Sequence, residues 1–230
     1  MLGIIGAMES ETQQFYEMMT DVTVMTAAGM TFRQGKMGGK DVVVVRSGIG
    51  KVNAAVCSQI LVDRYHVDGI INTGIAGSLK NEINIGDIVL STDALQHDVE
   101  ATAFGYEPGH IPQMDVKEFK ADERLLEIGL ACCRKVNPDI QTFTGRIVTG
   151  DQFIGDDDKK NWLRETFGGC CTEMEGAAIA QAAYLNQIPF LIVRAISDKA
   201  DKSVTVDYPT FEAAAIRHSV RLVTAMVEMI

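Results

Sequence analysis

Positive charge is scarce in this sequence, and so are long apolar runs. The 230 residues include 21 Lys and Arg against 31 Asp and Glu, which gives a formal net charge of −10. A surface with this excess repels phosphate backbones and anionic lipid headgroups, so we expect neither nucleic acid nor a membrane as a partner. No apolar run approaches the roughly 18 residues that a membrane-spanning helix requires.

Cysteine is sparse and is not spaced for metal binding. The five cysteines form two vicinal pairs and a single, namely Cys57, Cys132, Cys133, Cys170 and Cys171, without a CxxC or zinc spacing. We therefore expect buried, reduced thiols and a cytoplasmic location. The histidines also lack HExxH or HxH spacing, so we expect no metal. The N-terminus has no basic region before its apolar residues, which argues against a signal peptide.

What is present indicates one α/β domain over residues 1–230. Hydrophobic residues make up 47% and charged residues 23%, an ordinary globular composition. Short β-branched runs recur, each followed by a glycine-bearing turn and a helical pattern, which is typical of a parallel sheet with crossover helices. We expect strands at Leu2–Ile5, Val22–Ala27, Thr31–Met37, Val42–Arg46, Gly69–Thr73, Ile88–Leu95, Thr142–Val148, Cys171–Met174 and Phe190–Ser197. We expect helices at Ser10–Met19 (capped by Ser10), Lys51–Tyr65, Ala121–Lys135, Lys159–Phe167, Gly176–Leu185 and Thr210–Met229.

Glycine clusters mark the expected ends of four strands. They are Gly3–Gly6, Ser47–Gly50, Thr73–Ser78 and Thr149–Asp151. Ligands of open α/β sheets bind beyond the carboxyl ends of the strands, where glycine lets a backbone approach a ligand closely. Each cluster taken alone is equally well explained as a tight turn. None completes a GxGxxG or P-loop pattern, so we expect no dinucleotide, ATP or other cofactor.

Acidic residues gather near the same expected edge of the sheet. They are Glu11 after the first strand, Glu173 and Glu175 at a strand-to-helix junction, and Asp198 after an apolar strand. Burial raises the pKa of a carboxyl group, which suits it to proton transfer near neutrality. The alternative is an ordinary structural role: Glu11 would be an acid in a first helical turn, where the helix dipole favours it, and Asp198 would cap a helix or a turn. Phe153, beyond a glycine turn, is either a stacking platform for a flat ring or a core residue.

Eight segments together resemble one enzyme family. They are GIIGAMESE, SGIGKVNAA, INTGIAGSL, GDIVLSTDALQHD, ATAFGYEPGHIP, VTGDQFI, TEMEGAAIAQ and VRAISDKAD. Over nearly the whole chain, in order and spacing, they are similar to the 5′-methylthioadenosine/S-adenosylhomocysteine nucleosidases. The resemblance implies the nucleoside phosphorylase fold with a mixed sheet, a homodimer, and hydrolysis of the N-glycosidic bond of 5′-methylthioadenosine, S-adenosylhomocysteine and 5′-deoxyadenosine.

The resemblance also implies roles for individual residues. Asp198 is the expected general acid toward adenine N7, with Ser197 holding its carboxylate, and Glu11 is the base that activates water at the anomeric carbon. Glu175 is expected to bind the ribose hydroxyls, and Phe153 to stack on adenine. Met8, Ile49 and Tyr208 are expected to line the pocket of the 5′-thio substituent, closed by Phe104, Ile111 and Pro112 from the other subunit. Further expected contacts are Gly77, Ile154, Glu173, Met174 and Arg194.

Two residues depart from the family's pattern. Ile75 stands where several members have a hydroxyl residue, so a polar contact to ribose or water is lost. Tyr208 stands where we expect Phe in some relatives, which alters the pocket for the 5′ substituent.

Two rival functions remain open from sequence. A phosphorylase of the same fold needs cations at a phosphate site; the acids Glu9 and Glu11 oppose this reading, whereas Arg46 and Lys51 keep it open. A non-catalytic nucleoside-binding module needs no acids on both faces of its ligand.

Overall fold

The computed structural model describes residues 1–201 and 208–230, with the side chains of residues 208–210 outside the description. Its strands are β1 (Leu2–Gly6), β2 (Thr20–Ala27), β3 (Met30–Met37), β4 (Lys40–Arg46), β5 (Gly69–Ser78), β6 (Ile88–Gln96), β7 (Phe119–Lys120), β8 (Thr142–Thr149), β9 (Cys171–Glu173) and β10 (Phe190–Asp198). Its helices are α1 (Glu9–Met18), α2 (Lys51–Tyr65), α3 (Glu123–Val136), α4 (Asp157–Phe167), α5 (Gly176–Leu185) and α6 (Tyr208–Met229), with a 3₁₀ turn η1 at Thr102–Phe104.

These strands form one mixed sheet, part of which closes on itself. Strand β1 lies parallel between β4 and β5, and β2, β3 and β4 form an antiparallel meander. Strand β5 pairs with both β9 and β10, while β6 and β8 complete the circuit from β10 back to β9. The mixed α/β sheet expected from the resemblance is confirmed. The parallel pairs that the strand pattern predicts are present, and antiparallel pairs lie beside them.

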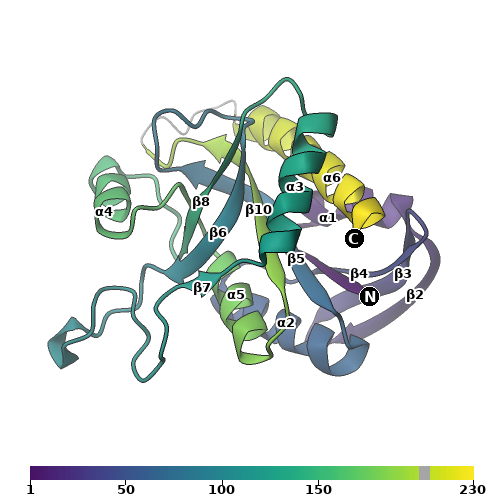
Figure 1. The fold of residues 1–230 in the computed structure, drawn as a ribbon, viewed down its shortest axis with the longest axis horizontal. Coiled ribbons are helices and arrows are strands. Elements are labelled where there is room, and N and C mark those ends of the chain that lie inside the picture. Colours follow the sequence, from purple (N-terminus) through teal and green to yellow (C-terminus); the bar gives the residue numbers. More distant parts are fainter. Residues whose placement is uncertain (202–207) are drawn as a thin grey trace.

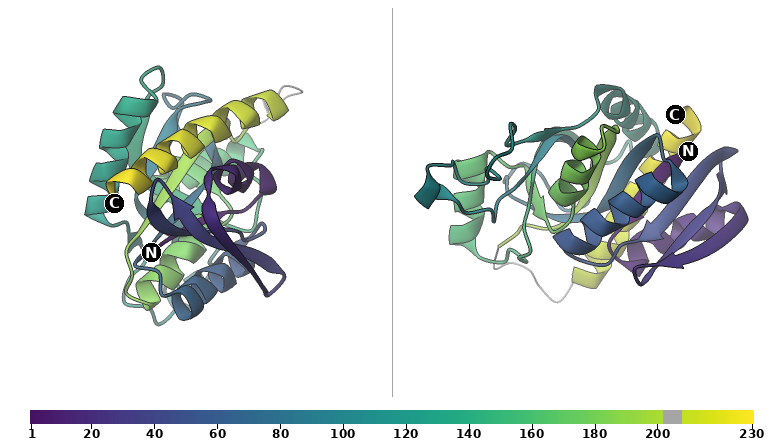
Figure 2. Two further views of the ribbon diagram at one scale, coloured as in Figure 1. Left: turned by 90° about the vertical axis from the view of Figure 1, so that its right-hand side faces the viewer. Right: turned by 90° about the horizontal axis from the view of Figure 1, so that it is seen from below.

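Helices cover both faces of the sheet. Successive residues of a central strand point to opposite faces, and because both sets are apolar, both faces must be buried. On β10, Leu191 belongs to the buried apolar cluster that includes Phe15 of α1 and residues of α3 and α6, whereas Ile192 belongs to the cluster that includes Leu61 of α2 and residues of α5. Figure 1 shows α1, α3 and α6 together on one side and α2 and α5 on the other, and Figure 2 shows the same layers edge-on.

Two local expectations are wrong. Helix α1 is not capped by Ser10: Met8 is the N-cap, and the carboxylate of Glu11 reaches back to the N-cap backbone. The cluster Thr73–Ser78 is not a turn, because β5 continues through it to Ser78. Pairing with β10 along this stretch, and with β9 at its end, supplies the backbone hydrogen bonds that a turn would otherwise have made locally.

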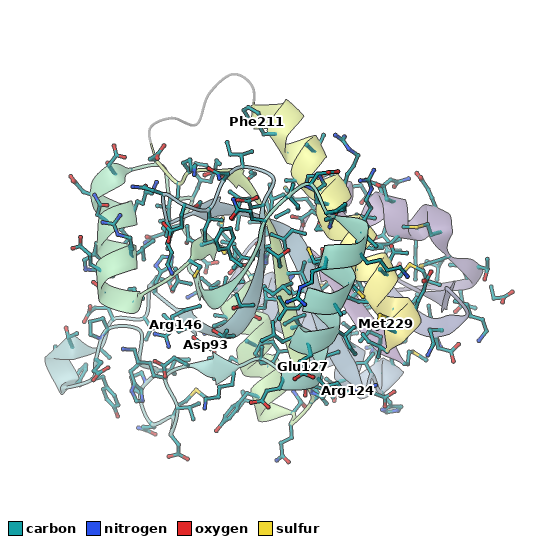
Figure 3. The ribbon with its side chains drawn as sticks, turned by 45° about the horizontal axis from the view of Figure 1, so that its top comes forward. Asp93, Arg124, Glu127, Arg146, Phe211 and Met229 are labelled. Carbon is teal, nitrogen blue, oxygen red and sulfur yellow. The ribbon has the colours of Figure 1, made fainter. Side chains whose placement is uncertain are left out.

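The segment of residues 97–118, between β6 and β7, projects from the body of the molecule (Figures 1 and 2). We call it the projecting segment. Arg146 of β8 anchors its base, with Nε 2.6 Å from Asp93 Oδ1 and Nη2 3.2 Å from Glu118 Oε1. The two strands bring Arg146 and Asp93 side by side (Figure 3).

Two further expectations concern side chains and membranes. All five cysteines are buried and have free thiols, as expected. Within the described ranges, no helix is long and apolar enough to cross a membrane.

Candidate active site

A cavity of about 160 Å³ lies at the carboxyl ends of β1, β5, β8, β9 and β10. Most of the residues predicted for the site meet there: Met8, Glu11, Ile49, Gly77, Phe153, Ile154, Glu173, Met174, Glu175, Arg194, Ser197 and Asp198. Ile75, named above as a departure from the family's pattern, lines it too. Ala7, Ala76, Gln152 and Thr172 also line it, and sequence analysis did not place them there. Each of these is a chain neighbour of a predicted residue, which was the available signal.

Glu11 is held in place by the backbone around it. Its Oε2 accepts hydrogen bonds from the N–H groups of Ala7 at 2.7 Å and Met8 at 3.0 Å, and its Oε1 accepts one from Ile75 at 3.1 Å. Burial raises the pKa of Glu11 by more than the positive charge of Arg194 and the three backbone N–H groups lower it. A fixed carboxylate with a raised pKa is suited to accept a proton near neutrality.

Arg194 supplies positive charge at the floor of the cavity and is 1% exposed. Its Nη2 donates to Asn72 Oδ1 at 2.6 Å and to the carboxylate of Glu173, and its Nη1 donates to the carbonyl oxygen of Ile75 at 3.3 Å. Nη2 also lies 3.6 Å from Glu175 Oε2. Sequence analysis missed Asn72, although a polar residue inside an apolar strand could have signalled a buried partner.

The two acids at the end of β9 differ in what they contact. Glu173 Oε2 accepts from the N–H groups of Glu175 at 3.0 Å and Gly176 at 2.7 Å, and Oε1 accepts from the hydroxyl of Thr149. Glu175 Oε1 accepts from the N–H of Gly50 at 2.9 Å. Burial, followed by the negative charge of Glu173, raises the pKa of Glu175 to about 7. Both carboxylate oxygens of Glu173 therefore accept hydrogen bonds from the protein, whereas the carboxylate of Glu175 can still accept hydrogen bonds from a ligand.

Asp198 ends β10 and is 6% exposed. Its Oδ2 accepts from the hydroxyl of Ser197 at 2.8 Å, and its Oδ1 accepts from the N–H of Ala200 at 2.7 Å. Ala200 has a φ of 52°, so the chain turns sharply after the carboxylate. An ion pair of 2.9 Å between Lys160 of α4 and Asp201 fixes the far side of that turn. The carboxylate of Asp198 is therefore held by the residue before it, Ser197, and by the turn after it.

Two glycines of β5 make room for these acids. A Cβ at Gly74 would lie 2.5 Å from Glu11 Oε1 and 2.3 Å from Arg194 Nη1, and one at Gly77 would lie 2.8 Å from Asp198 Oδ1. Any side chain there would displace a carboxylate. The two glycines lie three positions apart along the chain, which is about 10 Å of strand. Glu11 and Asp198 therefore lie against separate points of one strand.

The mouth of the cavity is apolar and open. Phe153 is 63% exposed and Ile49 is 53% exposed, whereas Ile154 is buried. The core-packing alternative for Phe153 is therefore wrong. Phe104, Ile111 and Pro112 lie on the projecting segment and do not line the cavity of their own chain. Tyr208 begins α6, but its side chain lies outside the described residues.

The two cations that favoured a phosphate site are paired elsewhere. Lys51 Nζ lies 2.6 Å from Asp98 Oδ1 and 3.0 Å from Gln96 Oε1. Arg46 Nη1 lies 3.3 Å from Glu9 Oε2. Neither cation lines the cavity.

A partly closed mixed sheet with acids at its strand ends agrees with the family model described as "Phosphorylase superfamily", which matches residues 1–228. A 5′-methylthioadenosine/S-adenosylhomocysteine nucleosidase from Geobacillus sp. (strain WCH70) is 41% identical over 227 residues, which cover 98% of this chain and 97% of that one. The chain belongs to this nucleosidase family. The family resemblance seen in the sequence is thereby confirmed.

Solved structures agree over the full length. The Neisseria meningitidis nucleosidase in complex with methylthio-immucillin-A superposes with a TM-score of 0.95 at 36% identity, covering 100% of this chain and 99% of that one. The Colwellia psychrerythraea 34H nucleosidase in complex with adenine gives a TM-score of 0.94 at 40% identity, covering 98% and 93%. The similarity therefore extends to the fold of the whole chain.

Proposed function

We propose that this chain hydrolyses the N-glycosidic bond of 5′-methylthioadenosine and S-adenosylhomocysteine, releasing adenine and a 5-thioribose. Both substrates appear in the name of the relative that is 41% identical to it. The observation that carries the chemistry is the pair of buried carboxylates, Glu11 and Asp198, at separate points of one cavity. Glycoside hydrolysis by inversion uses two carboxyl groups placed far enough apart to admit water.

Asp198 acts as the general acid at adenine. As the bond between C1′ and N9 breaks, its electron pair passes into the base, and the proton of Asp198 is transferred to N7. Ser197 and the N–H of Ala200 orient the carboxyl group for this transfer. Phe153, exposed at the mouth, stacks on the flat ring, while the backbone of Ile154 contacts its edge.

Glu11 acts as the general base toward the attacking water. Water attacks C1′ with its oxygen and gives a proton to the carboxylate of Glu11, whose raised pKa suits it to this role. Glu175, beside Arg194, accepts hydrogen bonds from the ribose hydroxyls. Each proton-transfer group supplies about 10²–10⁴-fold of the acceleration, and orientation of the bound sugar adds to it.

Water, and not phosphate, is the nucleophile. A phosphate dianion needs uncommitted cations, but Arg194 is surrounded by Glu173 and Glu175. Arg46 and Lys51, which kept the phosphorylase reading open, do not line the cavity. Glu11 would also repel a phosphate at the position of the water.

Two features of the chain support a homodimer working in the cytoplasm. Phe104 on the projecting segment is 84% exposed, an arrangement that favours insertion into the apolar mouth of a second copy. Ile111 and Pro112 follow on the same segment and complete the contribution to the partner's 5′-thio pocket. The five buried, unpaired thiols suit a reducing compartment.

Adenine release tests the proposal directly. The purified protein is incubated with 5′-methylthioadenosine, with and without inorganic phosphate, and free adenine and sugar are quantified. We expect release without phosphate and a free 5-methylthioribose product. A strict requirement for phosphate would favour a phosphorylase, and binding without any release would favour a nucleoside-binding module.

A further inference from the structure

A second hollow, of about 480 Å³, adjoins the catalytic cavity. The two share Ala7, Met8 and Ile49, so a ligand that passes Met8 and Ile49 leaves the first and enters the second. The remaining walls come from the β2–β3 turn, from the end of β4 and the chain that follows it, and from Glu9 of α1 and Asn53 of α2. Met8 and Ile49 are also the residues proposed to contact the 5′ substituent. The second hollow therefore lies where a longer substituent would extend.

This second hollow carries an accessible pair of opposite charges. Arg46 Nη1 and Glu9 Oε2 are 3.3 Å apart, and their side chains are 54% and 52% exposed. The charged residues that line the first cavity, in contrast, are all buried and bonded. An exposed ion pair stabilises a fold little, because water solvates both ions well. Breaking the Arg46–Glu9 ion pair to bind charged groups of a ligand therefore costs little free energy.

We propose that Arg46 and Glu9 form a subsite for the α-amino acid end of S-adenosylhomocysteine. Arg46 binds the α-carboxylate with its guanidinium, and Glu9 binds the α-ammonium. The zwitterion enters between the two side chains, so every charge keeps an opposite neighbour. This inference rests on the proposed function, because it extends the same bound nucleoside outward past Met8 and Ile49.

The subsite distinguishes substrates by their 5′ substituents. A methylthio group ends at the apolar wall formed by Met8 and Ile49, and it carries no charge for Arg46 or Glu9. A homocysteinyl group continues from the same sulfur and carries both charges. The ratio of kcat/KM for the two substrates therefore reports the subsite, because steps common to both substrates cancel.

The test compares three substrates in two variants. Arg46→Met keeps side-chain length without charge, and Glu9→Gln keeps shape without charge. We expect each to lower the kcat/KM ratio of S-adenosylhomocysteine to 5′-methylthioadenosine by about tenfold, a typical loss for one charge-assisted contact. The third substrate, decarboxylated S-adenosylhomocysteine, keeps only the ammonium. Its ratio to 5′-methylthioadenosine falls in Glu9→Gln and is unchanged in Arg46→Met.

Lys36 and Asp41 provide the matched control. They form an exposed ion pair of 2.8 Å at the other end of β4. Lys36→Met and Asp41→Asn should leave every ratio unchanged. If the Arg46 and Glu9 variants slow all three substrates equally, or leave the ratios at the wild-type value, the subsite is overturned.

Calorimetry separates failure of the subsite from failure of the proposed function. Binding of S-adenosylhomocysteine to Asp198→Asn is compared with binding to Asp198→Asn/Arg46→Met, so that turnover does not consume the ligand. About tenfold weaker binding in the double variant supports the subsite even if the wild type releases no adenine, in which case only the hydrolase proposal falls. Equal binding overturns the subsite.

Discussion

The inner wall of the cavity and its mouth are built on opposite principles. On the inner wall, Glu11, Glu173 and Arg194 are almost fully buried, and each makes several hydrogen bonds to fixed groups. At the mouth, Ile49 and Phe153 are more than half exposed. Burying a charge is costly unless it is paired, so the inner wall must be complete within one chain. Apolar side chains have no such requirement, and a second copy can cover them.

The largest effect should come from the acids of the inner wall. Glu11→Gln and Asp198→Asn keep side-chain size but remove proton transfer, so we expect kcat for adenine release to fall about 10²–10⁴-fold in each. Glu17→Gln, at an exposed position of the same helix as Glu11, is the control. Full activity in either inner-wall variant would show that the cavity is not the reaction centre.

Removing the central cation tests whether the inner wall depends on pairing. Arg194→Met leaves Glu173 and Glu175 buried without their counter-ion. We expect the free energy of unfolding to fall by about 3–5 kcal/mol, measured by denaturant titration. Adding Glu173→Gln should recover part of that loss, because one buried negative charge is removed as well. If the double variant were less stable than Arg194→Met, the pairing account would be wrong.

Features of the inner wall that depend on local sequence could be predicted, and those that depend on distant strand pairing could not. Glu11 and Asp198 were found because strand ends and local apolar runs are visible in the sequence, and strand ends meet at one edge of a sheet. The role of Asn72 and the continuation of β5 through Gly74 and Gly77 were not found. They depend on β9 and β10 pairing with β5, and pairings between strands distant in sequence leave no local pattern.

The mouth was predictable only through the family resemblance. Composition and periodicity do not show that Phe153 is exposed, since an aromatic residue after a strand is also expected in a core. Phe104 lies in a stretch without a clear period, and it does not line the cavity of its own chain.

A third prediction uses the raised pKa of Glu175. Its folded-state pKa of about 7 lies above the ordinary value of 4.5, so the fold favours the protonated form. The resulting stabilisation is present below about pH 4.5 and is lost as the pH rises to about 7, a difference of up to about 3 kcal/mol. Glu175→Gln, which cannot ionise, should lose less stability than the wild type between about pH 5 and pH 8. Denaturant titration at both pH values measures this, and identical pH dependence in both proteins would contradict it.

The smallest effect should come from the mouth. Phe104→Ala shortens the apolar side chain that we propose enters the partner's pocket, so we expect KM for 5′-methylthioadenosine to rise about tenfold with kcat nearly unchanged, as for uniform binding. Val24→Ala, on exposed strand β2, is the control.

Mixing Phe104→Ala with Asp198→Asn protomers sharpens the test. In a mixed dimer, the site that keeps Asp198 receives an intact Phe104 from its partner, so wild-type KM should return. If KM stayed high after subunit exchange, Phe104 would act on its own chain, and the division between an inner wall made by one chain and a mouth completed by two would fail.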